Sequence, residues 1–181
     1  MYCPTRMCLH GGVDTERRVR PRTDEDVEAC VRVLAEVHRS DGYPVNWPDR
    51  PGDWLSQPSA LGAWVAELEG RVVGHVSLCR SAEDDMAPGL WSERHGTSRE
   101  LAAVVGRLFV APQARGHGIG VLLMRRVTEE ARHRGLHPVL DVVASDAAAA
   151  ALYERLGWTR LATVEQRWSA SQLVTVHCYA A

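Results

Sequence analysis

The sequence predicts a single α/β domain, a mixed β-sheet covered by helices on both faces. Its 181 residues suit one domain, and a composition of 45% hydrophobic and 24% charged residues is that of an ordinary globular protein. Segments with strand and helix patterns alternate in the middle of the chain, which favours parallel strands there. Segments towards the ends read as antiparallel hairpins. We therefore expect both kinds of strand pairing in one sheet.

The first elements are predicted to follow a flexible leader. Residues 1–16 show no hydrophobic period, so we expect the domain to occupy residues 17–181. The pattern then predicts a short strand at 17–21, a helix at about 23–39, a proline- and glycine-rich loop at 41–58, and a hairpin with strands at 63–68 and 71–78.

The second half of the chain contains the alternating part of the pattern. Residues 80–98 are polar and read as a long loop. The segments after it predict a strand at 101–110, a helix at 119–134, a buried strand at 138–143, an alanine-rich helix at 147–156, and strands at about 159–168 and 173–179.

Charge and cysteine content argue against several partners. Lys and Arg number 21 against 23 Asp and Glu, which gives no broad basic surface for a nucleic acid or an anionic membrane. No segment reaches the roughly 18 apolar residues of a membrane span. We expect a cytoplasmic protein without nucleic acid or membrane partners, and the sequence is compatible with a homodimer.

The five scattered cysteines predict free thiols. Cys3, Cys8 and His10 lack a fourth ligand and the spacing of a zinc site, so no metal is expected.

A glycine-rich turn at 113–120 is the strongest functional signal. Gly116, Gly118 and Gly120 alternate just before a predicted helix, and Arg115 adds a positive charge. Glycines let the backbone approach a ligand closely, and free amides at a helix start bind anions. The alternative is a plain strand-to-helix connection. The Lys-Ser or Lys-Thr pair of a triphosphate loop and the glycine spacing of a dinucleotide fingerprint are both missing.

The turn resembles the pyrophosphate-binding signature of the Gcn5-related N-acetyltransferase (GNAT) family, which is Gln or Arg, two residues, Gly, one residue, Gly or Ala. It reads here Gln113-Ala114-Arg115-Gly116-His117-Gly118. The stretch from Asp146 to Trp158 is similar to the family helix whose tyrosine, here Tyr153, faces the sulfur of coenzyme A. The resemblance covers about residues 19–179. It implies the family's fold, in which two central parallel strands splay apart to admit the cofactor.

The resemblance also implies an activity and a set of residue roles. It implies an acetyl-CoA-dependent N-acetyltransferase that moves an acetyl group directly to a primary amine, with Tyr153 as the general acid that protonates the leaving thiolate. The alternative is that Tyr153 is an ordinary aromatic residue of a helix face, without a catalytic role. The cofactor contacts implied are Leu108, Phe109, Val110, Gln113, Ala114, Arg115, Gly116, His117, Gly118, Ile119, Gly120, Asp146 and Tyr153.

Two positions depart from the family pattern. Many relatives carry a glutamate on the fourth strand as the base, but residues 102–105 are Ala-Ala-Val-Val, and Asp146 stands where asparagine is usual. An amine delivered neutral would need no base. The missing glutamate also keeps a second function open, a non-catalytic acyl-CoA-binding or sensing domain, and a structural interaction domain would bind no cofactor. The candidate replacement bases are Glu93, His95 and Glu100, with His75 behind them.

The acceptor amine is expected to lie against residues 41–58 and 80–98. Acidic residues outnumber basic ones in residues 24–53 and again in residues 83–93, which favours a small cationic amine, with a peptide amine as the alternative. A merely solvated acidic face would give the same composition. The aromatics that could hold the amine by apolar or cation–π contact are Tyr43, Trp47, Trp54 and Trp91.

Overall fold

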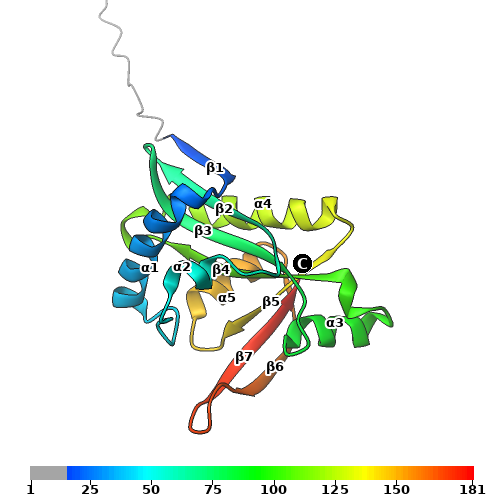
Figure 1. Ribbon diagram of the computed structural model, residues 1–181. Helices are drawn as coiled ribbons and strands as arrows, with labels where there is room; N and C mark the ends of the chain where they lie inside the picture. The colour runs from blue at the N-terminus through cyan, green and yellow to red at the C-terminus, as the bar shows by residue number, and fades with distance from the viewer. Residues whose placement is uncertain (1–15) are drawn as a thin grey trace, which may run out of the picture.

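The computed structural model describes residues 16–181 and contains one seven-stranded sheet (Figure 1). The strand order is β1-β2-β3-β4-β5-β7-β6. The leader predicted at 1–16 falls outside the described residues except for Glu16, as do Cys3, Cys8 and His10. The strands are β1 (Arg17–Pro21), β2 (Ala60–Leu68), β3 (Arg71–Arg80), β4 (Ala102–Val110), β5 (His137–Val143), β6 (Thr159–Arg167) and β7 (Leu173–Ala180).

The sheet is antiparallel except between β4 and β5 at its centre. Those two strands pair in parallel only at Ala102 with His137, Ala103 with Pro138 and Val104 with Val139. Beyond that point β4 continues to pair with β3, and β5 continues to pair with β7. The central strands therefore splay apart, which confirms the predicted mixed sheet and its split.

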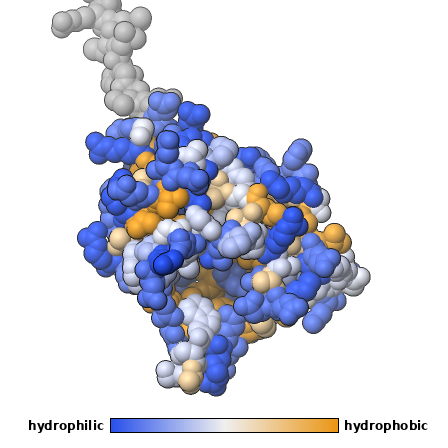
Figure 2. All heavy atoms as spheres, in the orientation of Figure 1, coloured by the Kyte–Doolittle hydropathy of each residue, from blue (hydrophilic) through white to orange (hydrophobic). Residues whose placement is uncertain are grey.

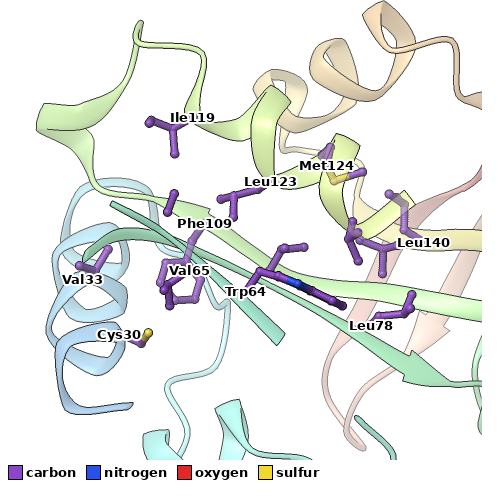
Figure 3. Packing of buried hydrophobic residues seen from close by; sticks show 14 of the residues in the cluster. Cys30, Val33, Trp64, Val65, Leu78, Phe109, Ile119, Leu123, Met124 and Leu140 are labelled. Atoms are coloured by element: carbon purple, nitrogen blue, oxygen red, sulfur yellow. The ribbon is translucent and has the colours of Figure 1, made fainter. Parts of the chain in front are cut away.

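Helices cover both faces of the sheet, as the sequence predicts. In α1, the buried residues Cys30, Val33, Leu34 and Val37 recur at helical spacing, so a single stripe faces the sheet. Leu123 of α4 is buried in the same core, and Figure 3 shows the two helices packing against the strands between them. The helices are α1 (Val27–Asp41), α2 (Pro51–Leu55), α3 (Met86–His95), α4 (Ile119–His133) and α5 (Ala147–Arg155).

The prediction of a loop at 80–98 is wrong, because α3 occupies most of it. Pro88 suggested a loop, but it lies in the first helical turn, where no amide is needed for helical bonding. Ala87 and Trp91, one turn apart, are buried, and the helix ends at Gly96 in the left-handed conformation. The helix packs on β4, β5 and β7 and forms a second apolar cluster.

The structure of residues 16–181 addresses the expectations about free thiols, metal sites and membrane spans. Cys30, Cys79 and Cys178 are buried free thiols. Within residues 16–181, no group of three or more His, Cys, Asp or Glu side chains is arranged to hold a metal ion. None of the helices in that range has the length and apolarity needed to cross a bilayer.

Candidate active site

The glycine turn forms the N-terminus of α4. Gly116 and Gly118 have φ values of 79° and 72°, a left-handed backbone that favours glycine, and Gly118 is the N-cap residue. A Cβ atom at Gly116 would meet nothing within 4 Å. The backbone amides of residues 116–121 donate to no group in the part of the chain that the structure describes. Free amides at the positive end of a 15-residue helix, with open space above them, fit an anion such as a pyrophosphate.

Two guanidinium groups flank this turn. Arg115 forms an ion pair with Asp41 at the end of α1, which holds the pKa of the Asp41 carboxyl below its usual value. The positive charge expected from Arg115 is therefore partly neutralised. Arg17 of β1, which sequence reasoning missed, donates from Nη1 to the carbonyl of His117 over 2.8 Å. The turn thus keeps basic groups on both sides.

The second half of β4 presents a free edge towards the split. Residues 105–110 pair with β3 but have no partner on β5. A bulge interrupts this stretch where Arg107 adopts a φ of 52°. The guanidinium of Arg107 lies 4.5 Å from the centre of the Trp54 ring and donates to Gln57, so it ties α2 and the following loop to the strand. An unpaired edge of this kind can bind an extended ligand through its amides, as expected for Leu108, Phe109 and Val110.

Tyr153 lies on α5 with its ring against Trp158 and Tyr179, at centroid distances of 6.0 and 5.8 Å. It is 6% exposed. Its hydroxyl has no hydrogen-bond partner among residues 16–181, and burial raises its pKa above the usual range for tyrosine. The phenol is therefore protonated at neutral pH and free to donate. Asp146 caps the same helix, accepting from the amide of Ala149 over 3.0 Å.

The structure places the three proposed bases away from this region. Glu93, His95 and Glu100 are exposed, on the last turns of α3 and just before β4. The ring of His95 lies 6.4 Å from that of His137, at the start of β5, where β4 and β5 are still paired. The strands separate further along, so none of the three is brought to Tyr153 or to the split.

His75, the fourth candidate, is fully buried and both of its ring nitrogens are engaged. Arg22 can only donate, so the 3.3 Å contact makes Nε2 of His75 an acceptor. Nδ1 then carries the proton and donates to the carbonyl of Arg107 over 3.0 Å. Burial lowers the pKa of His75 to about 4. Both ring nitrogens of this neutral histidine are already in hydrogen bonds, which does not support a role as base.

A cavity of about 670 Å³ lies between the loop after α1, the start of α3, β5 and the β6–β7 hairpin. Figure 2 shows this face hollowed above the tip of the β6–β7 hairpin, with apolar atoms in its floor. The loop after α1 closes over it, because Asn46 donates to Gln172 between β6 and β7 over 3.1 Å. Four carboxylates face a single guanidinium in its lining, which comprises Asn46, Asp84, Asp85, Met86, Asp141, Glu165, Gln166, Arg167 and Trp168.

The carboxylates of residues 24–53, expected to form an acidic rim, do not line this cavity. Among them, Asp26 pairs with Arg20 over 2.7 Å, Glu28 pairs with Arg32, and Asp41 pairs with Arg115. Asp84 and Asp85 do line the cavity, as expected for the segment 80–98. Sequence reasoning missed Asp141 and Glu165. A charged residue inside the otherwise apolar segment 138–143 was the available signal for Asp141.

The four aromatics proposed for the acceptor have different positions. Trp91 is buried on the inner face of α3, stacked on His137 at 4.6 Å, and is not part of the cavity lining. Trp54 supports Arg107, and Tyr43 meets Trp54 edge-on at 6.3 Å. Trp47 is exposed and lies against His38, with ring centroids 5.1 Å apart. Trp168, at the end of β6, is the aromatic that lines the cavity.

Comparisons with known proteins agree with this arrangement. A family model described as acetyltransferase (GNAT) family matches residues 29–158. An uncharacterised N-acetyltransferase of Methanocaldococcus jannaschii is 27% identical over 146 residues, 77% of this chain and 59% of the relative. Another from Archaeoglobus fulgidus is 29% identical over 123 residues, 64% of this chain and 74% of the relative. The chain thus spans about three fifths of the first relative's length.

Solved structures share the fold at low identity. A putative acetyltransferase from Salmonella typhimurium with its cofactor acetyl-CoA has a TM-score of 0.67 at 21% identity, covering 91% of this chain and 92% of that one. A ribosomal-protein-alanine N-acetyltransferase from Brucella melitensis has a TM-score of 0.67 at 23% identity, covering 91% and 98%. Because the family model covers well over half of the sequence, the chain belongs to the acetyltransferase (GNAT) family.

Proposed function

We propose that the protein is an acetyl-CoA-dependent N-acetyltransferase that transfers the acetyl group directly to a primary amine. The observation that carries this proposal is the set of unpartnered amides at residues 116–121, at the start of α4. The open space above Gly116 and the free edge of β4 also fit an elongated anionic cofactor. Family membership supports the same conclusion.

Each part of the chain has a separate task in this proposal. The amides of the turn bind the pyrophosphate, with Arg17 and Arg115 adding positive charge nearby. The edge of β4 at Leu108–Val110 aligns the pantetheine arm as an added strand would. Acetyl-CoA, when bound, supplies the thioester whose acetyl group is transferred. Tyr153 donates its proton to the departing sulfur.

The acceptor is proposed to be a small cationic amine. The cavity on the acceptor side has four carboxylates and one guanidinium, so it attracts an ammonium group and raises its local concentration. Trp168 adds an aromatic face for cation–π contact. A peptide amine is the second acceptor class, since two solved neighbours are named for alanine residues of ribosomal proteins.

A non-catalytic acyl-CoA-binding domain is the alternative function. The test is a screen of purified protein with acetyl-CoA against small amines, polyamines and short peptides, with detection of the free thiol. An enzyme releases thiol in proportion to at least one amine, and the acetylated product is confirmed by mass spectrometry. Binding of acetyl-CoA by calorimetry without thiol release from any amine would support the sensor and overturn the enzyme.

A further inference from the structure

The proposed site has a general acid but no base among the residues considered so far, and one half-buried carboxylate, that of Asp141, stands beside the split. Asp141 lies on β5, two residues past Val139, the last residue of β5 that pairs with β4. Extending the parallel register places it level with Gly106 of β4. A Cβ atom at Gly106 would meet only the Ser77 hydroxyl, at 3.9 Å. The space between β4 and β5 is therefore not filled by a side chain from β4 at this level.

The side chain of Asp141 points to the acceptor face of the sheet. Its strand neighbours Val139 and Val143, which point the same way, belong to the cluster beneath α3. Oδ2 accepts from the amide of Met86, the first residue of α3, over 3.3 Å. Oδ1 is buried and has no partner among the described residues. Asp141 thus lines the cavity with one carboxylate oxygen held by the α3 amide and the other shielded from solvent.

The surroundings of Asp141 affect its proton affinity. Burial raises its pKa above the usual value, and the Cys178 thiol and the amides of Met86 and Ala87 partly offset that rise. Asp85, before α3, and the cavity carboxylates Asp84 and Glu165 face it with the same sign of charge, and Arg167 is the one cation of the lining. A carboxylate with a raised pKa is a better proton acceptor near neutral pH.

We propose that Asp141 is the general base that deprotonates the acceptor ammonium, directly or through one water. The ammonium loses one proton to the Asp141 carboxylate, which later releases it to solvent. The neutral nitrogen forms its bond to the acetyl carbon as the carbon–sulfur bond breaks. Tyr153 gives a proton to sulfur and recovers one from the nitrogen, so the products are an amide, a free thiol and one released proton.

This inference rests on the proposed function, and its test is a pH–rate profile of Asp141→Asn with the best amine from the screen. The expected result is a loss of kcat of about 10²-fold near neutral pH and the disappearance of the rising limb assigned to the base. Affinity for acetyl-CoA, measured by calorimetry, should not change. The deficit should shrink with an amine of low pKa, which arrives already neutral and needs no base.

Glu165→Gln is the matched control, because it removes another carboxylate of the same cavity. It is expected to raise KM for a cationic amine and to keep the rising limb, because the base is still present. The midpoint of that limb should move to slightly lower pH, because a like charge facing Asp141 has been removed. A readout independent of turnover is thermal stability. A raised carboxyl pKa favours the fold below the unfolded-state pKa, and this advantage is lost as the pH rises through the folded-state pKa. Asp141→Asn should therefore match or exceed the parent's melting temperature at neutral pH.

The outcomes separate the two proposals. An unchanged rate and pH profile in Asp141→Asn, with an active parent, would overturn the role of Asp141 alone. Equal loss of the rising limb in Glu165→Gln would also overturn it, because the limb would then report the general field of the cavity. Absence of thiol release by the parent with every amine would overturn the proposed function, and the base with it.

Discussion

Tyr153 and Tyr179 are buried neighbours whose hydroxyls differ in their bonding. Tyr179 donates to Glu154 over 2.9 Å, whereas the hydroxyl of Tyr153 has no partner among the described residues. We expect Tyr153→Phe to lower turnover by about 10²-fold while acetyl-CoA affinity is kept, because only the proton donor is removed. Steady-state kinetics and calorimetry would measure the two effects.

Tyr179→Phe is the control for that substitution. It removes a buried tyrosine hydroxyl and a hydrogen bond worth about 1 kcal/mol, so it should reduce stability slightly and leave turnover close to the parent's. If Tyr153→Phe turned over as fast as Tyr179→Phe, Tyr153 would be a packing residue and the assignment of the acid would fail. The cofactor site could still be correct in that case.

The contrast between Tyr153 and Asp141 shows which site residues a sequence can identify. Tyr153 sits in a continuous stretch, Asp146 to Trp158, so its proposed role followed from a local resemblance. Asp141 acquires its setting from β5, α3 and the β6–β7 hairpin, which are distant in sequence. Its neighbours in the chain indicated only a buried strand. Asp141 is a candidate for the base because of its tertiary packing and not because of a local motif.

At the scale of elements, the pyrophosphate site proposed at the start of α4 can be tested with a control at the other end of the same helix. Gly118 before the helix and Gly135 after it both have left-handed φ values, 72° and 71°. A valine at either position therefore suffers similar backbone strain. Gly118→Val should weaken acetyl-CoA binding strongly, because a side chain intrudes between the amides and the pyrophosphate. Gly135→Val should lose similar stability and keep its affinity, as calorimetry and thermal unfolding would show.

Comparing Gly118→Val with Gly135→Val separates loss of the binding site from the effect of backbone strain. If both valine variants lost affinity in proportion to their loss of stability, the effect would be general destabilisation. If Gly118→Val folded and bound acetyl-CoA as tightly as Gly135→Val, the turn would not be the pyrophosphate site.

The helix α3 provides a second test at this scale. Met86 is its first residue, a position that accepts proline without disturbing the helix, and Asp85 already has the extended backbone that proline requires before it. Met86→Pro removes the amide that donates to Asp141. Losing a donor to the charged form should raise the pKa of the carboxyl, so the rising limb of the pH–rate profile should move to higher pH.

Met86→Ala is the control for the proline variant, because it shortens the same side chain and retains the amide. Its pH midpoint should equal that of the parent. Coincident profiles for the proline and alanine variants would show that the α3 amide does not tune the base. Circular dichroism would confirm that both variants keep the helix.

At the scale of the whole molecule, the element order and the covered sheet could be predicted from hydrophobic periods, because those periods are local. The helix at Met86–His95 could not, since its sequence contains Pro88 and Gly89 and its stability comes from Ala87 and Trp91 packing on β4, β5 and β7. The split followed from the family resemblance, and nothing in the sequence of β4 or β5 shows that their pairing stops at Val104 and Val139.

The split divides the sheet into β1–β4 and β5–β7, joined through three residue pairs of β4 and β5. A cofactor bound along β4 should therefore protect amides that are free without it. We expect acetyl-CoA to slow hydrogen exchange at residues 105–110 and 116–121, because opening would then require ligand release. The segment 176–180 of β7 is already paired on both sides and serves as an internal reference. Exchange followed by mass spectrometry, with Gly118→Val as the non-binding comparison, would measure the change. Protection spread evenly over both halves, or absent from both predicted segments, would place the cofactor elsewhere on the molecule.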